Sequence, residues 1–150
     1  PKQLNYIQKK LIDINYHIYG SPKYLEKHGF PKNINDLNKH SFISFGRGAP
    51  SPVYNPDWAL KLGTKDNKKR KTVMKVNSVY GLLLAVQSGV GLAALPDYIT
   101  VNQPNIVKVL PNIEGPITEA HFVYPQSMKN VARVQAFRNF LYSKISEWEF

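Results

Sequence analysis

The sequence of 150 residues contains no cysteine, which excludes a disulfide framework and thiolate chemistry and favours a reducing compartment. No apolar run is long enough to span a bilayer, and the first residues lack the pattern of a secretory signal. Nothing in the sequence therefore indicates a membrane, and we expect a cytoplasmic protein.

Motifs that carry catalysis, or that hold a cofactor or metal ion, are also missing. The sequence has no Gly-x-Ser-x-Gly and no glycine loop that ends in Lys-Ser or Lys-Thr. Gly89-Val90-Gly91 is too short for a dinucleotide fingerprint and follows a predicted helix. The histidines lack metal-ligand spacing, and we interpret all four as structural or surface residues: His17, His28, His40 and His121. We therefore predict no enzyme, no cofactor and no metal site.

Acidic residues are scarce: ten stand against twenty basic residues, for a net charge of +10. Residues 61–75 hold seven basic residues and one acidic residue, Asp66, and so a net charge of +6. One interpretation is a solvated loop between two strands. The other is a secondary contact with phosphate or with a protein.

Residues 76–96 organise the predicted fold. Apolar residues at helical spacing predict a helix over residues 78–88, with Asn77 or Ser78 as its cap and Gly89 at its end. The apolar run 91–95, closed by Pro96, predicts a strand buried on both faces, as in a parallel sheet. The polar N-terminus of the helix would then lie at the carboxyl edge of the strand ending at Val76, where open α/β sheets bind ligands.

The remaining segments alternate between strands and helices, which indicates a three-layer α/β fold. Residues 1–12 show no clear periodicity and are interpreted as a tail or as the end of a segment that has been cut away. Further strands are expected at 15–19, 41–45, 106–110 and 120–124, with 58–62 and 72–76 forming a hairpin around the basic loop. Helices are expected at 22–28, capped by Ser21, and at about 34–39, with a single helical turn at 97–100.

The last segment is predicted to be an amphipathic helix with one apolar stripe. The stripe consists of Val131, Val134, Phe137, Leu141, Ile145 and Trp148. We expect another element of the fold to pack against this apolar stripe.

Three motifs follow one another along the chain. The first is Ser21-Pro22-Lys23-Tyr24-Leu25 with Gly29, Pro31, Asp36-Leu37 and His40. The second is Asn77-Ser78 with Gly89-Val90-Gly91-Leu92-Ala93 and Leu95-Pro96. The third is Val123-Tyr124-Pro125 with Arg133-Val134-Gln135-Ala136-Phe137 and Phe140-Leu141. In this order they resemble the effector-binding domain of LysR-type transcriptional regulators.

The resemblance implies a type II periplasmic-binding-protein-like fold, in which two α/β lobes enclose a small effector in a cleft. Residues 13–119 would form the complete second lobe. Residues 1–12 would be the tail of the first lobe and the first crossing, and 120–150 its return strand and helix. The rest of the first lobe and the family's N-terminal winged helix-turn-helix are absent from this sequence. The C-terminal stripe would then lack part of its cover and favour association or disorder.

Five residues are candidates for effector binding. Asn77 and Ser78 lie at a helix N-terminus that suits a carboxylate or similar anion, although they are equally consistent with an ordinary cap. The resemblance places Phe45, Gly46 and Arg47 at the rim of the cleft, where Arg47 is either an anion ligand or a solvated surface residue.

Three functions are consistent with these patterns. The first is an effector-sensing domain of a regulator that binds DNA only through its absent N-terminal domain and forms a homo-oligomer, as the family does. The second is a solute-binding protein of a transporter with the same fold. The third is a basic nucleic-acid-binding module that uses residues 65–71, against which the absence of a recognition motif counts.

Overall fold

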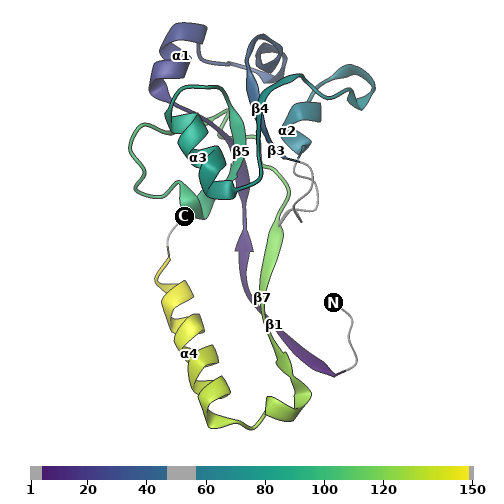
Figure 1. Ribbon diagram of the computed structural model, residues 1–150, viewed down its shortest axis with the longest axis vertical. Coiled ribbons are helices and arrows are strands. Elements are labelled where there is room, and N and C mark those ends of the chain that lie inside the picture. The colour runs from purple at the N-terminus through teal and green to yellow at the C-terminus, as the bar shows by residue number, and fades with distance from the viewer. Residues whose placement is uncertain (1–4, 47–56, 149–150) are drawn as a thin grey trace. The chain divides into compact units, whose positions relative to one another are not determined.

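The computed structural model describes residues 5–46 and 57–148, and these residues form two compact units. One unit is the continuous segment Asn15–Thr118. The other combines the two ends of the described chain, residues 5–14 and 119–148. Figure 1 shows both units.

Three antiparallel strands form the centre of the larger unit. Strand β2 (Tyr16–Gly20) lies between β5 (Ala93–Pro96) and β6 (Val107–Val109) and is antiparallel to both. All five residues of β2 are buried, as expected for a central strand rich in aromatic and β-branched side chains. The predicted strand at 91–95 is therefore present and buried. Its pairing is mixed, because β5 runs antiparallel to β2 whereas Leu92, just before β5, forms a parallel bridge to Phe42.

A parallel pair of strands adjoins this sheet. Strands β3 (Phe42–Phe45) and β4 (Thr72–Val76) run parallel, with Phe45 opposite Val76. A single bridge between Phe42 and Leu92 links β3 to the chain just before β5. Two hydrogen bonds brace it: the Ile43 amide donates to the Leu92 carbonyl at 2.8 Å, and the Leu92 amide to the Ser41 carbonyl at 2.9 Å.

The hairpin predicted for residues 58–62 and 72–76 is wrong. Residues Trp58–Lys61 form the short helix α2, in which the Leu62 amide donates to the Trp58 carbonyl at 3.1 Å. The apolar residues at 58, 60 and 62 alternate as they would in a strand. In the structure, one helical turn buries the three consecutive residues Trp58, Ala59 and Leu60 instead. Strand β4 pairs instead with β3. The basic segment includes a short 3₁₀ turn, η2 (Lys65–Asn67).

The predicted helices of this unit are present. They are α1 (Pro22–His28), the 3₁₀ helices η1 (Ile34–Lys39) and η3 (Asp97–Ile99), and α3 (Val79–Gln87). Gly89, with a φ of 79°, follows α3 in the left-handed region that glycine adopts without strain.

Helix α3 covers one face of the strands. Its residues Leu82, Leu83 and Val86 pack in one cluster with Tyr19, Ile43, Ala93 and Leu95. Because successive strand residues point to opposite faces, Ile18, Phe42 and Leu92 lie on the other face, and they are fully buried as well. Both faces of the strands are therefore covered, as in the predicted layered α/β fold.

Ser21 caps helix α1. Its side chain is buried and accepts a hydrogen bond from the Tyr24 amide at 3.3 Å, and Pro22 follows at the first helical position. We expect Ser21→Ala to lower the free energy of unfolding by about 1 kcal/mol, because it leaves a first-turn amide unpaired. Urea denaturation measures this loss. Ser88→Ala removes an exposed hydroxyl at the end of α3 and should have a smaller effect; equal losses would contradict the capping role.

The smaller unit pairs strands from distant parts of the chain. Strand β1 (Tyr6–Ile14) pairs with β7 (Thr118–Pro125), and the turn η4 (Gln126–Met128) leads toward α4 (Ala132–Ser146). The hydroxyl of Tyr142 in α4 donates to the Lys10 carbonyl in β1 at 2.9 Å. Residues 6–12 are therefore part of a strand, although their sequence shows no clear periodicity.

Helix α4 confirms the predicted C-terminal helix but has no buried residue within its span. Val134, Leu141 and Ile145 of the stripe are half-buried, whereas Phe137 is 53% exposed. The Phe137 ring meets the Phe122 ring of β7 edge-on, with centroids 5.8 Å apart. Within the described ranges, no helix is long and apolar enough to cross a membrane.

Candidate functional site

Four of the five residues predicted to bind an effector meet at one edge of the parallel strand pair. Phe45 ends β3 and lies opposite Val76, the last residue of β4. The Gly46 amide then donates to the Val76 carbonyl at 2.8 Å. A Cβ at Gly46 would lie 3.6 Å from the Asn77 amide nitrogen. The two strand ends thus bring Phe45 and Gly46 beside Asn77 and Ser78, while Arg47 lies outside the described residues.

Ser78 is the N-cap of α3. It has extended backbone dihedrals, and its hydroxyl accepts a hydrogen bond from the Gly81 amide at 3.3 Å. Asn77 precedes the cap, is exposed, and its side chain makes no hydrogen bond to another described residue. Ser78 therefore has a structural task, and the Asn77 amide is the polar group at this edge that is available for a ligand.

A hollow of about 270 Å³ lies beside this edge. Its lining includes Phe45 and Lys75, together with Arg70 from the basic segment. The guanidinium of Arg70 stacks over the Phe42 ring at 5.7 Å from its centroid. Partial burial lowers the pKa of Arg70, but an arginine remains charged throughout the physiological range. The surroundings of the strand edge are thus cationic, which suits an anionic ligand.

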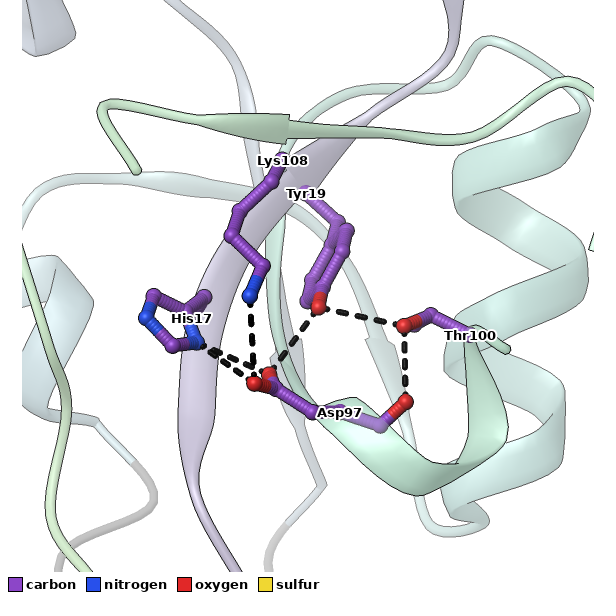
Figure 2. Close-up of polar contacts among 5 residues, drawn as sticks. All are labelled: His17, Tyr19, Asp97, Thr100 and Lys108. Atoms are coloured by element: carbon purple, nitrogen blue, oxygen red, sulfur yellow. Dashed lines mark hydrogen bonds and ion pairs between the residues drawn. The ribbon is translucent and has the colours of Figure 1, made fainter. Parts of the chain in front are cut away.

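A second polar cluster is buried inside the larger unit, and the sequence did not reveal it. Figure 2 shows Asp97 at its centre, surrounded by His17 and Tyr19 of β2 and Lys108 of β6. His17 Nδ1 lies 2.8 and 2.9 Å from the two Asp97 carboxylate oxygens, and the Tyr19 hydroxyl donates to Oδ1 at 2.9 Å. Lys108 Nζ donates to Oδ2 at 3.2 Å.

The protonation of the cluster follows from these contacts. An ionised carboxylate only accepts hydrogen bonds, so the Nδ1 of His17 carries a proton. Burial is the main cause that raises the pKa of the Tyr19 hydroxyl well above its usual range, and the nearby Asp97 charge adds to it. Tyr19 therefore remains a donor, while it accepts a hydrogen bond from Thr100 at 3.1 Å.

This cluster ties three elements of the larger unit together. It joins β2, β6 and η3, and His17, Tyr19 and Asp97 are all less than 8% exposed. Over the described part of the chain, no group of three histidine, aspartate or glutamate residues is arranged to hold a metal ion.

The antiparallel register explains why sequence reasoning missed this cluster. It places Tyr16 opposite Pro96, the residue before Asp97, and Tyr19 opposite Lys108. The spacing of His17 and Tyr19, which puts both side chains on one face of a strand, was the only local signal. Without the register, no pattern connects these two residues to Asp97.

Known proteins resemble this chain in sequence. The family described as the LysR substrate-binding domain matches residues 2–145. An uncharacterized HTH-type transcriptional regulator from Haemophilus influenzae is 29% identical over 123 residues, which cover 79% of this chain and 41% of the relative. The chain thus spans less than half of that regulator.

Solved structures resemble the chain in fold. The regulatory domain of CrgA, a LysR-type transcriptional regulator from Neisseria meningitidis, has a TM-score of 0.78 and 21% identity, over 97% of this chain and 71% of that one. The effector domain of AmpR from Pseudomonas aeruginosa has a TM-score of 0.68 and 18% identity, over 96% and 67%. Full-length AphB from Vibrio cholerae has a TM-score of 0.70 and 18% identity, over 95% and 49%.

These likenesses confirm the predicted periplasmic-binding-protein-like α/β fold. The family match extends over nearly all of the sequence, and the relatives that carry a functional name are transcriptional regulators. This chain therefore belongs to the LysR substrate-binding domain family.

Proposed function

We propose that this chain is the effector-sensing part of a LysR-type transcriptional regulator. In the intact protein, an N-terminal winged helix-turn-helix binds DNA, and a small molecule alters that binding through the effector domain. Membership of the family supports this assignment. So does the relative from Haemophilus influenzae, which is named as an HTH-type regulator and extends well beyond the part matched here. On this assignment the regulator acts in the cytoplasm as a homo-oligomer.

The larger unit, Asn15–Thr118, takes the role of the second effector lobe in this proposal, as we expected for residues 13–119. Residues 120–150 then contribute a strand and a helix to the first lobe. The observation that carries the proposal is the meeting of Phe45 and Gly46 with Asn77 and Ser78 at the ends of two parallel strands. Ligands bind at such carboxyl edges in α/β folds.

The proposed effector is a small anion. The N-terminus of α3 carries a partial positive charge, and Asn77 offers an amide donor directly before its cap. Lys75 and Arg70 line the adjacent hollow, and both favour an anion over a cation. Arg47, which we predicted as a further ligand, follows Gly46 in the sequence.

The test is the effect of small carboxylates on operator binding by the full-length regulator. Succinate, benzoate and citrate are added at constant ionic strength, and the affinity for operator DNA is measured by fluorescence anisotropy. We expect at least one of them to shift that affinity, and Asn77→Ala to weaken the response about tenfold, the effect of losing one charge-assisted hydrogen bond.

Asn112→Ala is the matched control, because it removes an exposed asparagine elsewhere in the same unit. It should leave the response unchanged. A response that Asn77→Ala leaves intact would contradict the assigned edge, and a regulator indifferent to all three carboxylates would contradict the anionic effector.

A further inference from the structure

The basic segment that follows α2 borders an open hollow of about 430 Å³. Four cations line it, Lys65, Lys68, Lys69 and Arg70, and Asn35 and Asn38 of η1 line it as well. None of the described residues that line it is acidic. Asp66, the one carboxylate of the segment, is exposed and does not line the hollow.

Arg70 is held in place at the edge of this hollow. Its Nε donates to Asn38 Oδ1 at 2.9 Å, its Nη1 donates to the Ala59 carbonyl at 3.1 Å, and its backbone amide donates to the Leu60 carbonyl at 2.9 Å. The third nitrogen, Nη2, is buried and has no hydrogen-bond partner among the described residues. The three hydrogen bonds therefore fix the position of the Arg70 guanidinium at the edge of the hollow.

The lysines around Arg70 are poorly neutralised. Lys69 pairs with Asp57, whereas no described carboxylate lies within ion-pair distance of Lys65 or Lys68. Four like charges within six residues repel one another, and a bound anion would relieve that repulsion.

We propose that this hollow binds a small molecule carrying several phosphate groups. The hollow shares Lys69 and Arg70 with the one beside the strand edge, whereas Lys65 and Lys68 line this hollow and not the other. Arginine presents a planar fork to phosphate oxygens and lysine a mobile point charge, which together form a common phosphate site. A linear oligophosphate carries several negative charges, which can pair with the four cations, and it fits within a hollow of this volume. The cations come from one short segment and not from an extended stripe, which favours a small polyanion over a DNA duplex.

Calorimetric titration of the purified chain with sodium tripolyphosphate tests the site. The ionic strength is held at about 0.1 M, so that interactions between distant charges are screened. The double variant Lys65→Ala, Lys68→Ala should weaken binding at least about tenfold. The control, Lys23→Ala with Lys27→Ala, removes two exposed lysines from α1. Because it lowers the net charge equally, it should weaken binding less than about twofold.

Three results would overturn the proposal. Equal weakening by both double variants would mean that the net charge alone attracts the anion. Absence of tripolyphosphate binding to the unsubstituted chain would remove the site. Binding of a 20-base-pair duplex that depends on Lys65 and Lys68, without binding of tripolyphosphate, would assign the segment to nucleic acid. Because Lys65 and Lys68 do not line the hollow beside the strand edge, these outcomes leave the proposed effector edge to the operator experiment.

Discussion

Replacing Asp97 with alanine is expected to lower the free energy of unfolding by about 3–5 kcal/mol, the usual effect of removing one partner from a buried ionic network. The substitution leaves Lys108 without its counter-charge and takes the shared acceptor from His17 and Tyr19. These donors belong to β2 and β6, which lie side by side, so the loss falls at the centre of the larger unit. Urea denaturation, followed by circular dichroism, measures the change.

Asp36→Ala is the matched control for Asp97→Ala. The Asp36 carboxylate also accepts three hydrogen bonds, from the Lys32 amide, the Asn33 side chain and the Lys39 side chain. Its partners are exposed to solvent, where water replaces the lost contacts. We expect a much smaller loss of stability for this variant. Equal losses at the two positions would show that burial of the Asp97 network adds nothing to the free energy of unfolding.

Gly91→Ala should destabilise the junction between β3 and β5 by about 2–3 kcal/mol, which is typical of overpacking in a rigid site. A Cβ at this position would lie 2.6 Å from the Ser41 carbonyl oxygen. The same carbonyl accepts the hydrogen bond from the Leu92 amide. Because the obstacle is backbone, no side-chain rotation can relieve the clash, and the bridge between Phe42 and Leu92 has to open.

Gly46→Ala is the control for this clash. A Cβ there meets its nearest atoms at 3.6 Å, an ordinary contact distance, so the same chemical change should alter the unfolding free energy by less than about 0.5 kcal/mol. Both variants are compared by urea denaturation. If Gly91→Ala were as stable as Gly46→Ala, the close approach at Ser41 would not limit this position.

The elements that sequence analysis predicted correctly are those with strong local signals. Ser21 and Pro22 begin α1, Ser78 begins α3, and Gly89 ends it. These caps depend on hydrogen bonds between residues two or three positions apart, which a sequence displays directly. The buried strand β5 was also found, because an entirely apolar run of this length has few alternatives.

Pairing between strands was not predictable in the same way. An apolar run carries no mark of direction, so the run 91–95 was assigned to a parallel sheet. Only its bridge to Phe42 is parallel, and its main neighbour β2 is antiparallel. Strand β1 was missed because its apolar residues do not alternate regularly with polar ones. The half-buried residues are Ile7, Leu11, Ile12 and Ile14, and two of them are consecutive. A two-stranded ribbon buries too little of either strand to give a clear alternation.

The candidate site shows the same limit. Residues alone identified Asn77 and Ser78, because they precede a helix. Only the family resemblance linked them to Phe45 and Gly46, since the predicted hairpin would have paired β4 with the wrong segment. In the structure, the parallel pairing of β3 with β4 provides the physical reason for their proximity.

The two ends of the described chain jointly form the smaller unit, whereas the larger unit is continuous. A ribosome releases protein from its amino end, and chains can fold while they are being made. Strand β1 emerges early but has to await its partner β7, which is translated after the whole of the larger unit. The order of synthesis therefore favours completion of the larger unit before β1 pairs with β7, and β1 needs protection from wrong partners in the meantime.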